Sequence, residues 1–267
     1  MRPTTFRRLR DIVYDASGIA LTPDKEALLS ARTGRRMRTL GLATHEQYLR
    51  VLEEDASGTE LVYLLDAVST NVTGFFREPT HFDDVEAAVR GWLQQGRLRL
   101  RLWSAACSTG EEAYSLAMAA GEAAAGRAAD VRILATDIST QALEAARRGV
   151  YADDDVAAVP PRLRDRYLVP DEQRGERHWH VRHELAKTVV FHRLNLAEPP
   201  LPIRGPLDLV LCRNVMIYFD GPVRTALLEE IRRVLRPGGL LIVGHAEGLA
   251  PRGPLFELVS PSVYRRP

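Results

Sequence analysis

Polar and charged side chains stand where apolar, strand-like runs of the sequence end. The alternating run at residues 97–106 leads into the loop SAACSTGEE, residues 104–112, which closes on a glycine and two carboxylates. Two further apolar runs end abruptly, one in Asp137 and the other in Arg213 and Asn214. In a mostly parallel sheet, ligands bind outside the carboxyl ends of the strands. These side chains therefore mark a candidate ligand site.

The loop and the acid indicate what kind of ligand this site takes. The loop lacks the G-x-G-x-x-G pattern, and carboxylates at Glu111 and Glu112, where a helix starts, would repel a pyrophosphate. Asp137 lies 27 residues after Gly110, where nucleoside-binding folds place an acid that accepts hydrogen bonds from ribose hydroxyls. A cofactor with a ribose, a positive charge and no pyrophosphate fits, and S-adenosylmethionine is such a molecule. Either Glu alone could instead only stabilise the helix dipole.

Alternating strands and helices must position these residues. Strands are expected at residues 97–106, 131–137, 188–196, 207–214 and 238–247, with helices at 80–95, from 111 onward, at 139–149 and at 222–235. This alternation predicts an α/β fold with a doubly wound, mostly parallel sheet. A last strand at 255–266 is expected at an antiparallel edge.

The first part of the chain has a different pattern. Residues 3–69 show apolar side chains at helical spacing, broken at SG and LTPD, and no strand-like runs. We therefore expect an all-helical domain at residues 1–70, a linker and connecting helix at 71–96, and the sheet domain at 97–267.

Composition excludes several classes of protein. The chain has 267 residues, of which 45% are hydrophobic, enough for a sizeable core, and its net charge of +1 favours neither nucleic acid nor an anionic membrane. No run of about 18 apolar residues and no signal region predicts export or membrane insertion. Cys107 and Cys212 suit reduced thiols in a cytoplasm. The N-x-T sequon at Asn71 is therefore expected to stay unglycosylated.

Six strings of the sequence carry a family resemblance. They are STNVTGFFRE, LWSAACSTGEEAYSLAM, ATDIS, FHRLNL, LVLCRNVMIYFD and RVLRPGGLLIVGHAE, in this order from residue 69 to residue 247. Through them nearly the whole chain resembles the chemotaxis receptor glutamate O-methyltransferases, the CheR family. The resemblance implies a helical N-terminal domain and a Rossmann-like methyltransferase domain with a small β-insertion at about residues 163–187. It also implies a bacterial, cytoplasmic enzyme that converts receptor glutamates to methyl esters and leaves S-adenosylhomocysteine.

Carried over residue by residue, the resemblance implies cofactor contacts in the linker, in the first loop and after three strands. These contacts are Asn71, Thr73, Arg77, Glu112, Asp137, Asn195, Leu196, Arg213 and Asn214. Glu112 is chosen over Glu111 by the resemblance alone. Asn195 could instead cap its own loop. Phe75 and Phe76 could line the adenine or methionine region, or form an interdomain contact.

The same resemblance assigns the catalytic roles to Arg77 and Tyr218. A glutamate substrate has a pKa of about 4.3 and is ionised at pH 7, so it needs approach and alignment rather than a general base. The fork of an Arg can hold such a carboxylate, and a Tyr hydroxyl can provide a second hydrogen bond. Alternatively, Arg77 could pair with Glu78 or Asp83, and Tyr218 could be a core aromatic.

A basic cluster near the N-terminus is a candidate docking surface. Residues 1–50 hold ten Arg or Lys against five Asp or Glu, and the excess gathers in SARTGRRMR, residues 30–38. Such clusters can be merely solubilising. The docking hypothesis is that Arg32, Arg35, Arg36 and Arg38 bind the acidic helical bundle of a chemoreceptor. Some family members hold a receptor peptide with a Gly-rich turn, whereas residues 168–182 contain one glycine, Gly175, which argues against that tether here.

Other residues capable of chemistry receive no role. His178, His180 and His183 lie close together, but no Cys or acid is placed to complete a site, so no metal is expected. His245 and Glu247 follow a strand end and stay unassigned. The enzyme is expected to be a monomer. The alternative functions are a methyltransferase for another carboxylate and a non-catalytic, cofactor-binding signalling scaffold.

Overall fold

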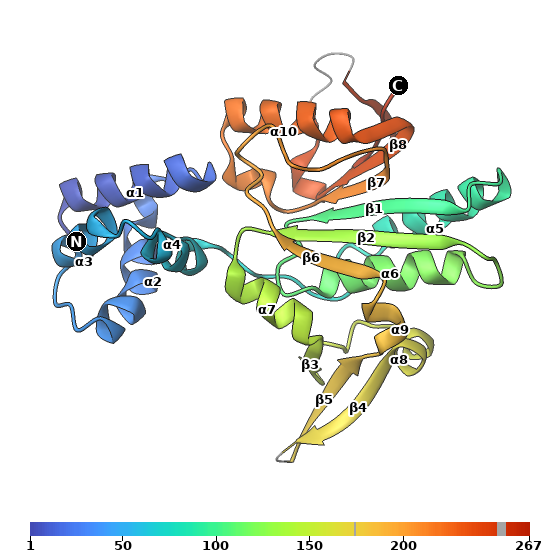
Figure 1. Cartoon of the computed structure of the whole chain (residues 1–267), viewed down its shortest axis with the longest axis horizontal. Coiled ribbons are helices and arrows are strands. Elements are labelled where there is room, and N and C mark those ends of the chain that lie inside the picture. The colour runs from blue at the N-terminus through green and yellow to red at the C-terminus, as the bar shows by residue number, and fades with distance from the viewer. Residues whose placement is uncertain (174, 250–254) are drawn as a thin grey trace.

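The molecule has two parts joined by an extended connection. The computed structural model describes residues 1–173, 175–249 and 255–267. Figure 1 shows a helical part at the N-terminus and a larger part built on a sheet. Within the described residues, no helix combines the length and the apolar character that a membrane span requires.

The first part, all of which the structure describes, is helical as expected. It contains α1 (Pro3–Ser17), a short 3-10 turn η1 (Pro23–Lys25), α2 (Glu26–Thr39), α3 (His45–Glu54) and α4 (Thr59–Val68). Gly18 ends α1 with a left-handed φ of 70°, and Thr44 forms a capping box with Gln47 at the start of α3. The apolar faces share one core, which includes Phe6, Leu9, Val13, Leu29, Tyr48, Leu52, Leu64 and Leu65.

The second part is a seven-stranded sheet in the described residues, with the order β6-β2-β1-β7-β8-β10-β9. Its strands are β1 (Arg99–Ala105), β2 (Asp130–Asp137), β6 (Val189–Arg193), β7 (Leu207–Cys212), β8 (Leu235–Val243), β9 (Glu257–Ser260) and β10 (Val263–Arg265). The first five strands in this order run parallel, and β10 and β9 are antiparallel at one edge. The predicted α/β class, with an antiparallel edge, is confirmed.

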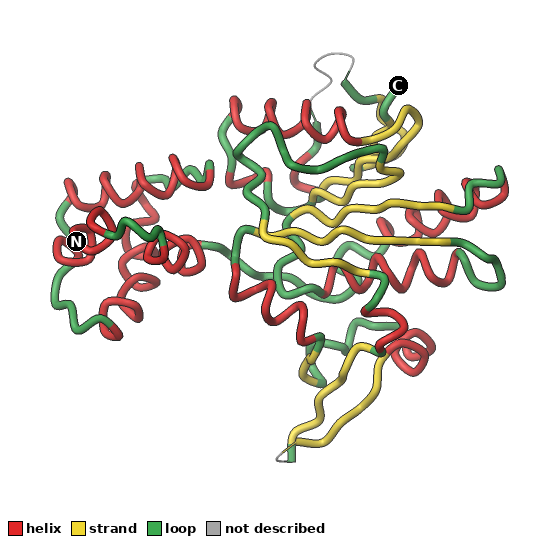
Figure 2. The backbone as a smooth tube through the Cα atoms, in the orientation of Figure 1, coloured by secondary structure: helices red, strands yellow, loops and turns green. Residues whose placement is uncertain are grey.

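Helices cover both faces of the sheet (Figure 2). α5 (Thr80–Gln94) and α6 (Glu111–Ala123) share a core with Leu100 and Leu102 of β1, whereas α10 (Gly221–Val234) packs with Trp103 on the opposite face. α7 (Thr140–Arg148) lies against β6 and β2. Every residue of β7 is buried. Burial on two faces explains why these strands read as continuous apolar runs.

A small antiparallel sheet projects from the larger one (Figure 1). It consists of β3 (Val150–Ala152), β5 (Glu176–Val181) and β4 (Leu168–Gln173), flanked by the short helices α8 (Pro161–Tyr167) and α9 (His183–Ala186). β3 lies before the expected range of 163–187, because it pairs with β5 from a distant position. The expected Gly-poor turn includes residue 174, which lies outside the described residues.

Two segments differ most from the expected strands, and β6 and β7 also end two or three residues earlier than expected. The segment 255–266 forms a hairpin rather than one strand, because Ser262 takes a left-handed φ of 65° after Pro261, which has no N–H for a ladder. The strand expected at 238–247 runs instead from Leu235 to Val243, and residues 245–247 form a 3-10 turn, η3 (His245–Glu247). This turn places polar groups just beyond the carboxyl end of the strand.

Hydrogen bonds tie the helical part to the sheet part. The Asp66 carboxylate of α4 accepts from the N–H and the hydroxyl of Thr140 at the start of α7, at 2.7 and 2.6 Å. The Tyr14 hydroxyl of α1 donates to Asp220 at 2.5 Å. Ile19 forms an antiparallel bridge with Phe219. The two parts therefore meet along one seam beside the carboxyl ends of the central strands.

Replacing Asp66 with Ala should destabilise the protein by about 1–3 kcal/mol, because two donors of Thr140 would lose their acceptor in a mostly buried contact. Thermal unfolding followed by circular dichroism measures this. Asp154→Ala, at an exposed carboxylate of the sheet part, is the control. Equal unfolding midpoints for the two variants would show that the Asp66–Thr140 contact contributes nothing to stability.

Candidate active site

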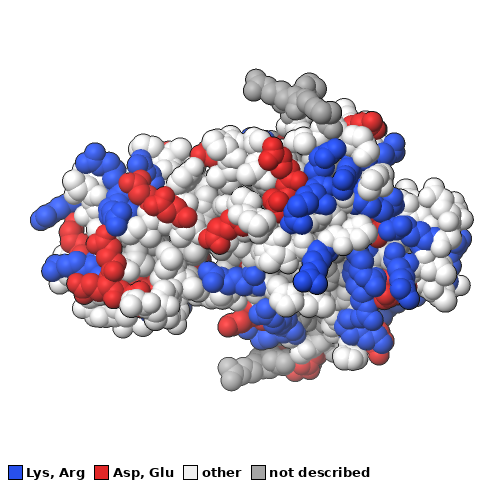
Figure 3. Space-filling view, turned by 45° about the horizontal axis from the view of Figure 1, so that its top comes forward, with Lys and Arg blue, Asp and Glu red and all other residues white. Residues whose placement is uncertain are grey.

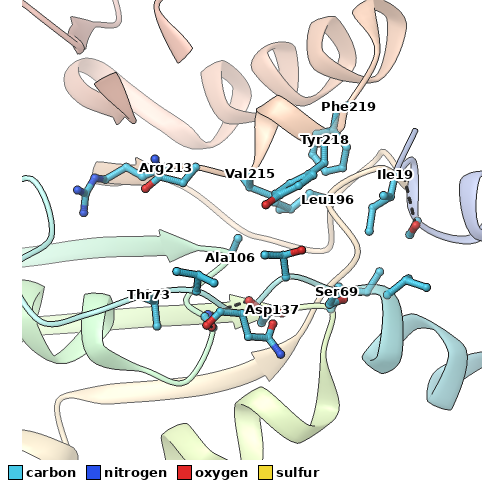
Figure 4. A pocket seen from close by; sticks show the side chains of 18 of the residues that line it. Ile19, Ser69, Thr73, Ala106, Asp137, Leu196, Arg213, Val215, Tyr218 and Phe219 are labelled. Carbon is cyan, nitrogen blue, oxygen red and sulfur yellow. Dashed lines mark hydrogen bonds between the residues drawn. The ribbon is translucent and has the colours of Figure 1, made fainter. Parts of the chain in front are cut away.

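One cavity collects the ten residues that were assigned to cofactor or substrate. It lies where the helical part meets the carboxyl ends of the central strands, and it encloses about 1220 Å³ including its opening to solvent. The expected residues that line it are Asn71, Thr73, Arg77, Glu112, Asp137, Asn195, Leu196, Arg213, Asn214 and Tyr218. Figure 4 shows Asp137 and Thr73 on one side of it and Leu196, Val215 and Tyr218 on the other.

Asp137 is a fixed acceptor at the end of β2. One carboxylate oxygen accepts the Ser108 N–H at 2.8 Å, and the other accepts the Ser139 N–H at 2.9 Å. The residue is 8% exposed, and burial raises the pKa of its carboxyl despite these hydrogen bonds. Each oxygen keeps a lone pair for a further donor. Ser108, with a left-handed φ of 50°, is thereby held against the cavity.

The two adjacent glutamates at the start of α6 have different surroundings. Glu112 lines the cavity, where one oxygen accepts from the Ser104 hydroxyl at 2.7 Å and the other pairs with Arg213 at 3.1 Å. Burial raises the pKa of the Glu112 carboxyl, and Arg213 opposes this. Glu111 instead accepts from the Thr109 hydroxyl at 2.7 Å and is not among the lining residues.

Gly110 sets the path of this loop. Its φ is +102°, and a Cβ there would lie 2.8 Å from the Ala146 Cβ of α7. Only glycine fits both the backbone conformation and this close approach. The loop can therefore pass directly over the carboxyl ends of β1 and β2 before α6 begins.

Arg213, the first residue after β7, lies buried between two carboxylates. Its guanidinium is 3.1 Å from Glu112 and 3.2 Å from Glu78, and it also donates to the backbone carbonyl of Arg77. The residue is 4% exposed. Its guanidinium is thus engaged by other residues of the protein. Arg213 therefore positions these neighbours as well as lining the cavity (Figure 4).

Glu247, which received no role from the sequence, holds the loop that follows β7. Its carboxylate accepts the N–H of Asn214 at 2.6 Å, of Gly244 at 2.9 Å and of Ile217 at 3.2 Å. A Cβ on Gly244 would lie 2.8 Å from this carboxylate, so the approach requires glycine. The signal in the sequence was an acid within four residues of the end of an apolar strand, at the carboxyl ends of the parallel strands.

Arg77 and Tyr218 present free polar groups to the cavity. Arg77 is exposed, and its side chain donates a 3.0 Å hydrogen bond to the Val72 carbonyl. Pairing with Glu78 or Asp83 is not observed among the described residues, because Glu78 faces Arg213 instead. Tyr218 ends a 3-10 turn, η2 (Met216–Tyr218), and lies at the cavity wall rather than in the apolar core. Within the described chain, no hydrogen bond engages its hydroxyl.

The side chain of Asn195 is committed to the protein. Its amide nitrogen donates to the Ala16 carbonyl and to Glu198, both at 2.8 Å, and its oxygen accepts the Ala197 N–H at 3.1 Å. The alternative considered from the sequence, a residue capping its own loop, is therefore observed. Asn195 still lines the cavity, beside Leu196.

Phe75 and Phe76 do not line the cavity. Phe75 is 2% exposed and packs edge-on against Tyr151, with ring centroids 4.9 Å apart. Phe76 packs against Phe82 at 5.1 Å. Phe75 belongs to the core of the sheet part and Phe76 packs against this core, so neither of the two roles considered for them is observed among the described residues.

The helical part supplies cavity walls that sequence reasoning missed. They include Ile19, Leu21, Lys25, Leu28 and Arg32. The apolar segment GIAL after α1 was a weak signal, because an apolar run outside a helix needs cover. Its position depends on the bridge between Ile19 and Phe219, which joins residues two hundred positions apart. The arrangement is a cavity that opens to solvent, with carboxylates at the strand ends, an apolar wall, and the side chains of Arg77 and Tyr218 at its side.

Similar proteins span nearly the whole chain. A "Chemotaxis protein methyltransferase" from Klebsiella aerogenes is 38% identical over 259 residues, covering 97% of this chain and 88% of that protein. "Chemotaxis protein methyltransferase 2" from Pseudomonas aeruginosa is 39% identical over 259 residues, with coverages of 97% and 91%. A protein of the same type from Borreliella burgdorferi is 35% identical over 266 residues, with coverages of 97% and 93%.

Family models match both parts of the chain. Residues 4–69 match the all-alpha domain of CheR methyltransferases, and residues 71–264 match their SAM binding domain. The resemblance seen in the sequence motifs and the expected cofactor are thereby confirmed. The chain belongs to the CheR methyltransferase family, with S-adenosylmethionine as its cofactor.

Proposed function

We propose that this protein transfers a methyl group from S-adenosylmethionine to glutamyl carboxylates of chemoreceptors, giving methyl esters and S-adenosylhomocysteine. The family supports methyl transfer, and the names of the relatives point to chemotaxis. The observation that carries the choice of a carboxylate is Arg77, an exposed guanidinium at the cofactor cavity without an ion-pair partner in the described chain. A monomeric enzyme acting in a bacterial cytoplasm belongs to the same proposal.

The residues of the cavity fit the cofactor. Asp137 has lone pairs free to accept from ribose hydroxyls, and its oxygens cannot turn away because two backbone N–H groups hold them. Glu112 adds negative charge that favours a cationic ligand. Leu196 and Val215 offer apolar surface to an adenine ring. The proposed contacts also include Asn71 and Thr73 of the linker, and Asn195 and Asn214, which follow β6 and β7.

The proposed chemistry asks little of the protein beyond orientation. S-adenosylmethionine supplies, when bound, an electrophilic methyl group on a sulfonium. The substrate glutamate is ionised near pH 7, so no residue has to remove a proton from it. Arg77 would hold one carboxylate oxygen, and the Tyr218 hydroxyl would limit the remaining freedom of the group. Such alignment is worth several kcal/mol of the activation barrier.

Arg77→Ala should lower kcat for receptor methylation about 100-fold, while the Kd for S-adenosylmethionine rises less than about tenfold. The kcat of Arg77→Lys should lie between those of the parent protein and Arg77→Ala, because an ammonium keeps the charge but lacks the two-pronged hydrogen bonding of a guanidinium. The assay supplies radiolabelled S-adenosylmethionine with a receptor cytoplasmic fragment and counts base-labile label. Arg90→Ala, at an exposed helix position paired with Glu86, is the control. Full activity of Arg77→Ala, or label stable to base, would refute the proposal.

Glu112→Gln should weaken binding of S-adenosylmethionine about tenfold or more, because it removes a carboxylate that lines the cavity and pairs with Arg213. Glu111→Gln is the matched control and should leave the Kd within about twofold. Titration calorimetry of both variants gives the comparison. A larger effect at Glu111 would reverse the assignment.

The docking hypothesis narrows to two arginines. Arg32 donates to the Val68 and Ser69 carbonyls, at 2.6 and 3.2 Å. Arg36 pairs with Glu60 at 2.7 Å and lies 3.6 Å from the centre of the Tyr63 ring. Both side chains are therefore used within the helical part. Arg35 and Arg38 are exposed and remain available to an acidic partner.

The surface as a whole does not single out the helical part. Figure 3 shows basic and acidic side chains side by side on the helical part, at left, whereas basic side chains gather over the sheet part on the face in view. Arg35 and Arg38 would therefore contribute to docking through their place on α2, whose residues Leu28 and Arg32 line the cavity, rather than through an overall excess of charge.

Arg35→Glu with Arg38→Glu should lower kcat/KM for the receptor fragment about tenfold at low ionic strength, and less at 0.5 M salt, because exposed charges are screened. The Kd for S-adenosylmethionine should not change. Arg99→Glu with Arg127→Glu is the matched control, since both residues are exposed and Arg99 lies at the amino end of β1, whereas the cavity lies at the carboxyl ends of the strands. Equal kinetics for the two double variants would rule out docking through α2.

A further inference from the structure

A buried histidine beside the active site has no hydrogen bond. His81, in the first turn of α5, is 1% exposed, and in the described residues neither ring nitrogen has a hydrogen-bond partner. A buried polar group without a partner costs about 1–3 kcal/mol and calls for a ligand or a function.

Two further ligand-type groups face this ring. The Nδ1 atom of His81 is 3.3 Å from a carboxylate oxygen of Glu78, and the Nδ1 atom of His245 is 4.0 Å from the same oxygen. The two rings are edge-on, with centroids 4.7 Å apart. One ligand atom from each of the three residues lies within 4.8 Å of the others. In tetrahedral sites with bonds of about 2.0–2.2 Å, neighbouring ligands are about 3.4 Å apart, so small side-chain rotations suffice.

The charge balance around this cluster favours a cation. Three carboxylates lie near one buried guanidinium: Glu78 and Glu112 pair with Arg213, and Glu247 accepts the N–H of the next residue, Asn214. Arg213 itself repels a cation, and it pairs with the same Glu78 oxygen that faces the two imidazoles. A bound ion would take over this oxygen, while Arg213 would keep its contacts with Glu112 and the Arg77 carbonyl. The His245 side chain is 55% exposed, which leaves a path from solvent and room for a water ligand.

We propose that Glu78, His81 and His245 bind one transition-metal ion of the zinc type. Two imidazoles and one carboxylate suit Zn²⁺ and Co²⁺ rather than Mg²⁺ or Ca²⁺, which prefer oxygen ligands. The ion would link Glu78, the residue after Arg77, to His245 in the turn after β8. It would thereby position Arg77 without taking part in methyl transfer. The site is separate from the cofactor contacts, since neither histidine lines the cavity.

The test uses the full chain without a polyhistidine tag, stripped with a chelator that is then removed. Zn²⁺ alone is titrated in competition with a chromophoric chelator, and Co²⁺ is added separately to record its visible absorption. We expect one equivalent of Zn²⁺, a Co²⁺ spectrum typical of four-coordination, and no competition from Mg²⁺. Zn²⁺ should also raise the unfolding temperature, because it binds the folded state only.

His245→Ala is the deciding variant, since its side chain is exposed and its loss should not disturb folding. It should weaken Zn²⁺ binding at least about 100-fold and abolish the thermal shift. The control is His178→Ala with His180→Ala, which removes two histidines of β5 outside the cluster and should leave binding intact. Absence of binding in the parent protein, an unchanged affinity in His245→Ala, or loss of binding in the control would overturn the proposal.

Discussion

The buried guanidinium of Arg213 joins three segments that are far apart in the chain. It lies between Glu112 of α6 and Glu78 of the linker, and it donates to the Arg77 carbonyl, while its own backbone directly follows β7. Removing one partner from such a buried pair costs about 3–5 kcal/mol, because a charge is left without compensation. The positions of the linker, of the first loop and of the loop after β7 all depend on this contact.

Backbone strain gathers around the same contact. Phe76, Glu78 and Asn214 have φ values of 51°, 57° and 56°, which side chains other than glycine seldom adopt. Such conformations persist where the surroundings over-determine them, and they are common at functional sites. Here two contacts hold the strained backbone in place: Arg213 pairs with the carboxylate of Glu78, and Glu247 accepts the N–H of Asn214. Arg77 lies between two of these strained residues, so its direction toward the cavity is built into the backbone.

Much of the fold could be predicted from local pattern. Apolar runs alternating with helical spacing indicated the sheet, and the acid that ends β2 indicated a nucleoside ligand, because a strand end is visible in the sequence itself. The hairpin of β9 and β10 was missed, since the turn at Ser262 interrupts an otherwise strand-like run. The surroundings of Phe75 and Phe76 were not predicted correctly, because an aromatic pair beside functional residues has the same sequence pattern whether it faces a ligand or packs in a core.

The sequence by itself determined the two-part organisation, the fold class, the family through its motifs, and the residue types at the carboxyl ends of the strands. Only the tertiary structure decided that Glu112 rather than Glu111 faces the cavity, that Asn195 and Arg36 are committed to the protein, and that the helical part closes the site. The reason is physical. Periodicity records which face of an element is buried, whereas the partner of a buried charge is set by chain topology, which brought Arg213 to Glu78 across 135 positions.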